Sequence, residues 1–340
     1  MSSDEESDRP RRLEDGTVVY LLSVATRLDE AKKLGNDPAA VEEVEIIVSN
    51  VFEEIKSRSA SAACDKRTNS IIEDLILRSP LPVLLETMNR FTKYARFLTT
   101  NRHSSHLLQS LFSRMGYVLQ HQGLDESLEG ETTDAVLKMA AAILAPRSLD
   151  LVMKDMCGSH VVRSLICLLS GLPSIGEKRG KNAKHQHGNS LAVSLDALLE
   201  PDCYYIRSSA SFTVPTEFHD SLLTGLVADH LLLKSAKDLQ WLVCNTNSGA
   251  IITLLLRVLM NPQLVAGGRE AAMRLISGLL ELPETDGDRM PALYEHMTAA
   301  VTGDAASDSA KAALSEAVAN WEYCAVVLTE LSENSTATFF

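Results

Sequence analysis

The segment 155–169, DMCGSHVVRSLICLL, places small and polar residues at the start of an otherwise apolar stretch. Apolar residues then fall at 161, 162, 165, 166 and 169, the spacing of a helix that buries one face. Ser159 and Arg163 are four residues apart, so they lie one turn apart on another face, with His160 beside them. A hydroxyl, an imidazole and a guanidinium on one helix could recognise a ligand through hydrogen bonds and a flat ring.

Two catalytic interpretations of this region fail on the residues. Cys157 and His160 could form a nucleophile and a base, but both lie at one short helix start with no orienting third group. The segment 171–178, GLPSIGEK, is close to a phosphate-binding loop, but Glu177 interrupts the pattern and no Ser or Thr follows the lysine. The six cysteines form no CxxC pair, which indicates neither a disulfide framework nor a zinc site. We therefore expect no enzyme activity, no cofactor and no metal.

Charge is unevenly distributed along the chain, whose net charge is −13. Residues 191–340 carry 8 Lys and Arg against 19 Asp and Glu, a balance of −11. Residues 56–114 carry 10 basic against 4 acidic residues, a balance of +6. A local basic patch matters more to a polyanion than the total charge does. Because no apolar signal segment opens the chain and the apolar run 250–260 is too short to cross a bilayer, we expect a soluble intracellular protein.

Three other segments, 65–76, 101–112 and 245–256, align with 155–166. Their first residues are all helix N-caps: Asp65, Asn101, Asp155 and Asn245. Their fourth residues are all small: Thr68, Ser104, Gly158 and Ser248. Aliphatic pairs follow at 71–72, 107–108, 161–162 and 251–252, and apolar pairs at 75–76, 111–112, 165–166 and 255–256. Each copy is expected to be a capped helix with one buried stripe, in an all-α solenoid.

The remaining chain is organised around these copies. Residues 1–17 are expected to form a disordered tail of acidic and basic residues, and residues 18–340 the helical repeat domain. The copies start 36, 54 and 90 residues apart, and polar segments at 121–134 and 171–190 interrupt them, so both are expected to be loop insertions. The basic residues between 178 and 184 could contact phosphate or only keep an insertion solvated.

A unit of about 36 residues whose second helix begins GSHVVR resembles the Pumilio (PUF) RNA-binding repeat. The chain is more closely similar to the nucleolar protein 9 family of Pumilio-like ribosome-assembly factors. That similarity runs over residues 18–260, in the order of TNRHSSHLLQSLF, MKDMCGSHVVRSLICLLSG and FTVPTEFHDSLLTGLVADHLLLKSAKDLQWLVCNTNSGAIITLLL. Members of the family are longer than this chain, so it is expected to hold the N-terminal half of a solenoid of Pumilio-like, armadillo-like repeats.

The resemblance implies that three side chains of each copy meet one RNA base, two at its edge and one stacked between them. Carried onto this sequence, the triplets are Asn69, Ser70 and Glu73; Ser105, His106 and Gln109; Ser159, His160 and Arg163; and Gly249, Ala250 and Thr253. The middle two triplets suit this chemistry, whereas Ser70 and Ala250 cannot stack and Gly249 has no side chain. Recognition through backbone charge and RNA shape with a few base contacts therefore fits better than reading base by base. Three cations precede these positions and are expected to meet phosphate: Lys66, Arg67 and Arg102.

Two functions follow as hypotheses. The resemblance implies a non-catalytic RNA-binding protein of the nucleus and nucleolus that binds precursor ribosomal RNA and acts in small-subunit (18S) rRNA maturation and ribosome biogenesis. Its expected partners are RNA and components of the small-subunit preribosome, with no membrane, and it is expected to be a monomer. The alternative is a HEAT- or armadillo-like scaffold for protein–protein interaction, whose acidic half 191–340 would suit a basic peptide.

Overall fold

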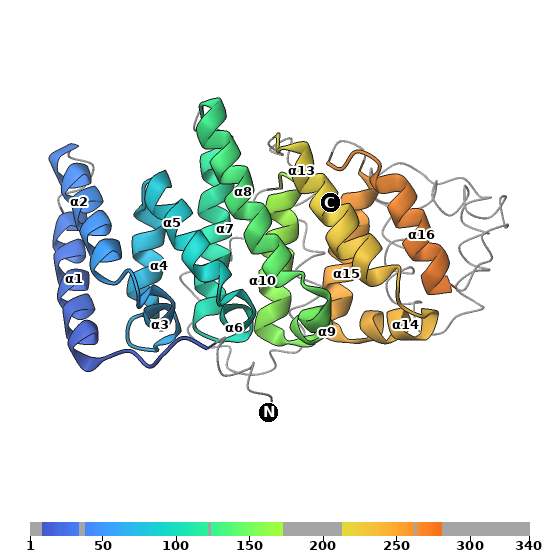
Figure 1. Cartoon of the computed structure of the whole chain (residues 1–340), viewed down its shortest axis with the longest axis horizontal. Coiled ribbons are helices and arrows are strands. Elements are labelled where there is room, and N and C mark those ends of the chain that lie inside the picture. The colour runs from blue at the N-terminus through green and yellow to red at the C-terminus, as the bar shows by residue number, and fades with distance from the viewer. Residues whose placement is uncertain (1–8, 34–37, 122–123, 173–212, 262–263, 281–340) are drawn as a thin grey trace. The chain divides into compact units, whose positions relative to one another are not determined.

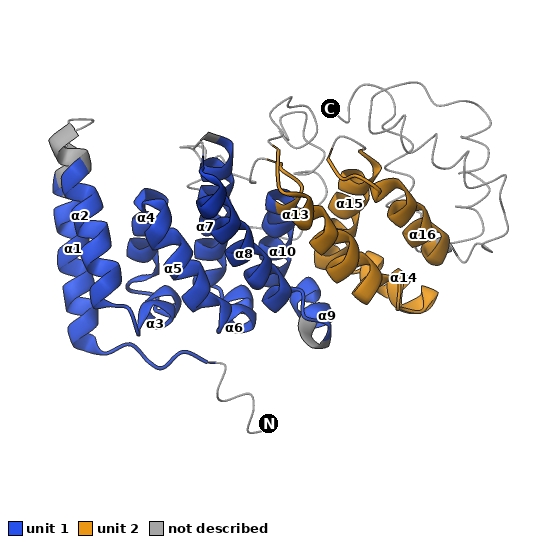
Figure 2. Ribbon diagram, turned by 45° about the horizontal axis from the view of Figure 1, so that its top comes forward, with its two compact units in different colours: residues 1–168 blue, residues 169–340 orange. Residues whose placement is uncertain are grey.

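A computed structural model describes residues 9–33, 38–121, 124–172, 213–261 and 264–280 (Figure 1). These residues form helices that lie in rows. The described residues contain helices, turns and bends and no strand. They divide into two compact units, residues 1–168 and 169–340 (Figure 2). The expected all-α repeat architecture is therefore confirmed.

The first unit holds ten helices among its described residues, and the last of them ends at the unit boundary. They are α1 (Asp15–Lys33), α2 (Pro38–Glu54), α3 (Ser59–Cys64), α4 (Asn69–Arg78), α5 (Leu81–Thr92), α6 (Ala95–Thr100), α7 (Ser104–His121), α8 (Glu126–Ile143), α9 (Pro146–Lys154) and α10 (Met156–Leu169). Each helix packs on the corresponding helix of the next repeat: α3 on α6, α4 on α7, α5 on α8 and α6 on α9. Each repeat thus stacks its helices on the same helices of the next repeat, as in a solenoid.

The second unit repeats the same local pattern. Its described helices are α13 (Thr216–Asp220), the π-helical η2 (Ser221–Leu231), α14 (Ala236–Cys244), α15 (Thr246–Met260) and α16 (Gly268–Leu280). Helix α16 packs on η2, α14 and α15, and α14 packs on α15. No single described helix is long and apolar enough to span a membrane; α14 and α15 reach that size only as a pair bent by 107°.

A short helix, one extended residue and a long helix form the recurring junction. The extended residue is the predicted cap in all four copies, with ψ between 125° and 137°. Its side chain accepts hydrogen bonds from backbone N–H groups two or three residues later: Asp65 from Arg67, Asn101 from His103 and Ser104, Asp155 from Gly158, and Asn245 from Asn247 and Ser248. The predicted caps are confirmed at Asp155 and Asn245, which directly precede α10 and α15 and satisfy donors that a helix start leaves unpaired. Helices α4 and α7 begin four and three residues after Asp65 and Asn101, because a turn comes first. The N-cap of α4 is Thr68, so the prediction that Asp65 caps this helix is wrong, and its bond with Arg67 closes the turn instead.

The small fourth residue of each copy lies against the end of the preceding short helix. The hydroxyls of Thr68 and Ser104 donate to the carbonyls of Ala62 and Leu98, six residues earlier, at 2.7 and 2.8 Å. Ser248 donates likewise to Leu242. In the third copy a Cβ on Gly158 would lie 2.3 Å from the carbonyl oxygen of Val152, so only glycine fits the closest of these approaches.

The apolar pairs form the core, as their spacing predicts. Every residue of the aliphatic and apolar pairs in the four copies is at most 8% exposed. In the third copy the whole span from Val161 to Leu172 is buried, and Gly171, just after the end of α10, has a φ of 71°, a conformation that favours glycine.

Two predicted boundaries differ from the structure. Residues 126–134 form the first half of α8 instead of a loop, because Asp125 caps that helix through the backbone N–H of Leu128 and Thr132 begins its buried face. The tail is shorter than residues 1–17, because Leu13 is buried and α1 begins at Asp15. Residues 1–8 and 173–190, the latter covering most of the second expected insertion, lie outside the described part of the chain.

The junction geometry predicts a contrast between two glycines. Gly158→Ala is expected to lower the free energy of unfolding by about 1–3 kcal/mol, because the added methyl meets backbone that must move. Gly130→Ala is the matched control, because Gly130 lies on the exposed surface of α8 with no atom within 4 Å of the added Cβ. This change is expected to raise the free energy of unfolding by up to about 1 kcal/mol, because alanine favours a helix more than glycine does. Urea denaturation measures both; equal effects would contradict the close approach at the junction.

Candidate nucleic-acid interface

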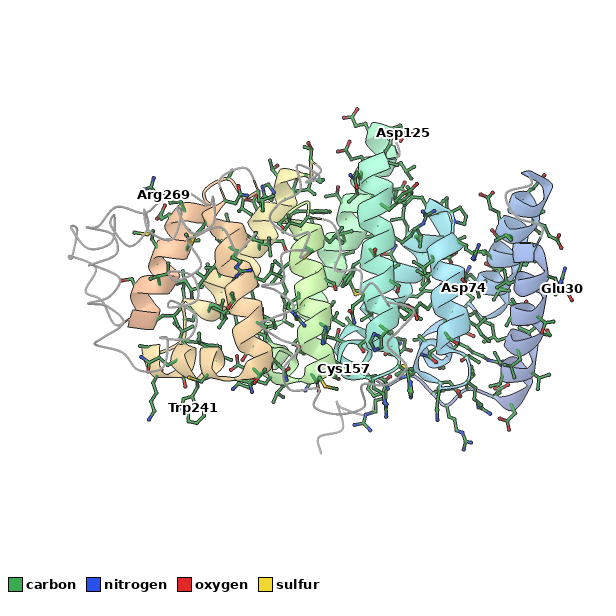
Figure 3. The ribbon with its side chains drawn as sticks, turned by 180° about the vertical axis from the view of Figure 1, so that it is seen from behind. Glu30, Asp74, Asp125, Cys157, Trp241 and Arg269 are labelled. Carbon is green, nitrogen blue, oxygen red and sulfur yellow. The ribbon has the colours of Figure 1, made fainter. Side chains whose placement is uncertain are left out.

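Helices α4, α7 and α10 bring the first three predicted triplets to one row. Helix α4 packs on α7. Seen from behind, α4, α7 and α10 follow one another in chain order, with Asp74 on α4 and Cys157 at the start of α10 (Figure 3). His106 of α7 lowers the pKa of His160 of α10 electrostatically, so the two imidazoles are close enough to interact. The row therefore places polar first turns of successive repeats beside one another.

His160 is held as a neutral ring. The Nη2 of Arg163 donates to its Nδ1 at 2.9 Å, which leaves the imidazole proton on Nε2. Burial lowers the pKa of His160 to about 4, and the charges of Arg163 and His106 act in the same direction. Arg163 is itself 8% exposed and its Nε donates to the carbonyl of Ser159 at 3.4 Å. The third triplet is thus an uncharged aromatic face beside an oriented guanidinium.

The second triplet presents its ring outward. His106 is exposed, whereas Ser105 is buried and Gln109 is half-buried with its amide donating to the Ser105 carbonyl at 3.2 Å. An exposed imidazole on a fixed helix can stack on a base. Of this triplet, His106 is the side chain most open to a ligand.

The first triplet is partly committed to packing. Ser70 is exposed and Asn69 is half-buried in the first turn of α4. Glu73 accepts a hydrogen bond of 2.6 Å from the hydroxyl of Ser110, which ties α4 to α7. The carboxylate therefore helps to fix the spacing between two repeats as well as facing the row.

The fourth triplet lies in the second unit and is buried. Gly249, Ala250 and Thr253 are all buried, and the Thr253 hydroxyl donates to the Gly249 carbonyl at 2.9 Å. A Cβ on Gly249 would lie 2.4 Å from the Val243 carbonyl oxygen, so this glycine serves the junction of α14 with α15. Contact between this triplet and a base stays a prediction, and the burial weighs against it.

The three predicted phosphate-binding cations differ in their surroundings. Lys66 and Arg102 are exposed and have no ion-pair partner among the described residues. Arg67 pairs with Asp65 at 2.9 Å and with Asp15 of α1 at 3.0 Å, so two carboxylates already neutralise it. Its expected contact with phosphate stays a prediction, whereas the geometry gives it a role in fixing α1 to the junction before α4.

His103, which the sequence did not predict as a site residue, lies two residues after Asn101 and three residues before His106. Burial lowers its pKa, and the nearby positive charges of Arg102 and Lys66 lower it further. Both cations therefore act on the same ring, which places the turns before α4 and α7 close together, while the carboxylate of Asp65 acts on the ring in the opposite direction.

The state of His160 predicts how stability depends on pH. Unfolded histidine titrates near pH 6.5 and folded His160 near pH 4, so between these values the unfolded state binds more protons and stability falls as pH falls. Replacing His160 by Gln is expected to make that fall shallower between pH 6.5 and about 4 while leaving the slope above pH 7 unchanged. Urea denaturation of both proteins across this range is the test, and identical slopes would contradict a depressed pKa.

Comparison with known proteins agrees with this architecture. Residues 58–319 match the NOP9-like PUF repeat domain. A protein of Botryotinia fuckeliana (strain B05.10) named Nucleolar protein 9 is 26% identical over 301 residues, which are 81% of this chain and 37% of that protein. Nucleolar protein 9 of Komagataella phaffii (strain GS115 / ATCC 20864) is 26% identical over 235 residues, 64% of this chain and 34% of its own length.

A solved structure, APUM23-GGAAUUGACGG, shares the fold with a TM-score of 0.62 at 18% identity, over 96% of this chain and 56% of that chain. The chain spans little more than a third of the length of the two Nucleolar protein 9 relatives, so what is similar is one part of those proteins. The family match covers most of the chain and includes all four junctions with their triplets. The chain belongs to the NOP9-like PUF repeat domain family.

Proposed function

We propose that the chain is a non-catalytic RNA-binding protein of the nucleolus that binds precursor ribosomal RNA and acts in maturation of the small-subunit rRNA. The observation that carries this proposal is the row formed by α4, α7 and α10. It presents an exposed imidazole on His106 and a neutral one on His160, beside the unpaired cations Lys66 and Arg102. Flat rings for bases and cations for phosphates are the two contacts that single-stranded RNA requires.

The family supports the choice of ligand and place. The relatives carry the name Nucleolar protein 9, and the structural neighbour carries GGAAUUGACGG, whose uracils are those of an RNA. Within this proposal the protein shields or remodels the precursor and does not cut it, works as a monomer and meets components of the small-subunit preribosome. Sequence-specific reading is confined to the second and third repeats, because only these hold a ring between two hydrogen-bonding side chains.

Binding itself is tested with a labelled single-stranded segment of precursor small-subunit rRNA in fluorescence anisotropy at several salt concentrations. The affinity is expected to fall steeply as salt rises, because bound cations release counterions from the phosphates. Absence of RNA binding together with retention of a basic peptide would overturn the proposal in favour of a peptide-binding scaffold.

Stacking by His106 predicts a loss that salt does not change. His106→Ala is expected to weaken binding of single-stranded RNA by roughly 1–3 kcal/mol, because one base loses its stacking face. The slope of affinity against salt is expected to stay the same, because a stacked base releases no counterions. His106→Phe keeps a flat ring at the same exposed position and is expected to retain binding; equal losses in both variants would contradict stacking.

Phosphate contact by the two unpaired cations predicts the opposite behaviour. Replacing Lys66 and Arg102 by Gln is expected to weaken binding to every single-stranded RNA alike and to lower the salt slope by roughly 0.7 for each lost contact. Arg67 stays unchanged in this variant, because its pairs with Asp65 and Asp15 hold the fold. A salt slope equal to that of the unmutated protein would exclude these two residues from the interface.

A further inference from the structure

The segment that precedes α1 is laid across the first repeats. Residues 9–14, RPRRLE, are called the strap. In two views it runs from the base of α1 beneath α3 towards α6 (Figures 1 and 2). Its Leu13 is buried, and its Arg9 guanidinium lies 5.8 Å from the centre of the Phe97 ring of α6, a cation–π geometry. The strap is therefore anchored at both ends.

The acidic groups near the strap are already engaged. Glu14 pairs with Arg58 at 3.2 Å, while Asp15 and Asp65 both pair with Arg67. These contacts hold the start of α1 against the junctions before α3 and α4. Because these carboxylates pair with Arg58 and Arg67, they form no ion pair with the arginines of the strap.

The cations left over gather at one edge of the first unit. Several basic residues of 56–114 form ion pairs on helix surfaces: Lys56 and Arg90 pair with Glu86, and Arg78 pairs with Asp74. Six exposed cations have no ion-pair partner among the described residues and lie on the strap, on α6 or at the turns before α4 and α7: Arg9, Arg11, Arg12, Lys66, Arg96 and Arg102. These six residues are called the basic edge. Blue nitrogen tips gather along the same end of the unit in Figure 3.

The basic edge adjoins the base-facing row. Arg102 lies four residues before His106, and Lys66 lies four residues before Ser70, each in the turn that precedes the helix. Arg12 acts electrostatically on Asp65, at the junction before α4, so the strap is close to the start of the row. An RNA strand whose bases contact the first turns of α4 and α7 would have its phosphates beside the basic edge.

We propose that the strap is an RNA-binding element, in which Arg9, Arg11 and Arg12 hold phosphates of an RNA strand as it leaves the row of α4 and α7. This proposal rests on the proposed function, because its ligand is the phosphodiester backbone of the bound RNA. Guanidinium suits that ligand, since its fork of N–H donors matches phosphate oxygens. Anchoring at Leu13 and Phe97 orders the arginines before RNA binds, which lowers the entropy lost on binding.

The test compares two charge-matched variants. One carries Arg9→Gln, Arg11→Gln and Arg12→Gln; the control carries Arg27→Gln, Lys237→Gln and Arg274→Gln, exposed cations outside the basic edge that also lack a described ion-pair partner. Affinity for a labelled single-stranded RNA is measured by anisotropy against salt. The strap variant is expected to lose up to about 2 from the salt slope, roughly 0.7 for each phosphate contact, and the control is expected to keep the slope of the unmutated protein.

The outcomes separate the strap from the proposed function. If the unmutated protein binds RNA and the strap variant keeps its slope, or the control loses as much slope as the strap variant, the strap proposal is overturned and the proposed function stands. If the unmutated protein binds no RNA, both fall. Should the triple variant unfold, Arg11→Gln with Arg12→Gln keeps both anchors, and an unchanged slope in that variant overturns the proposal in the same way.

Discussion

The architecture depends on one local constraint, the sharp junction at which a short helix gives way to a long one through a single extended residue. An Asp or Asn at that residue accepts hydrogen bonds from backbone N–H groups two or three residues later, in the turn or first turn of helix that follows. A small residue three positions later lets the long helix begin against the last turn of the short helix. With both conditions met, the same bend recurs, and each repeat can stack on its neighbour in the same orientation.

The same junction produces the candidate interface. In the first unit α4, α7 and α10 each follow this bend, so the first turn of one lies next to that of its neighbour, and polar residues come together from separate repeats. His106 and His160 are 54 residues apart in sequence and interact electrostatically. Lys66 and Arg102, at the turns before α4 and α7, act electrostatically on His103, as His106 does, so cations and imidazoles lie close together at the start of α7.

Ion pairing decides which of the many basic residues are available to a polyanion. The sequence count of residues 56–114 treats all their cations alike. In the folded unit Arg67 faces two carboxylates, and Arg58 faces Glu14, so these side chains hold the strap and α1 in place. Lys66 and Arg102 keep no such partner among the described residues. The paired arginines, Arg58 and Arg67, anchor the start of α1 and the strap, and the strap in turn carries arginines that have no ion-pair partner among the described residues.

The sequence by itself determined the caps of α10 and α15, the small residues and the buried pairs, because each rests on hydrogen bonds or periodicity within a few residues of the chain. It did not determine that residues 126–134 are helical: their polar composition resembles a loop, and α8 depends on burial from Thr132 onward as well as on the cap at Asp125. The anchoring of the strap on Phe97, the neutral state of His160 and the pairing of Arg67 with Asp15 were likewise decided by tertiary structure. Contacts between residues tens of positions apart, and the burial that shifts a pKa, arise only when the repeats stack.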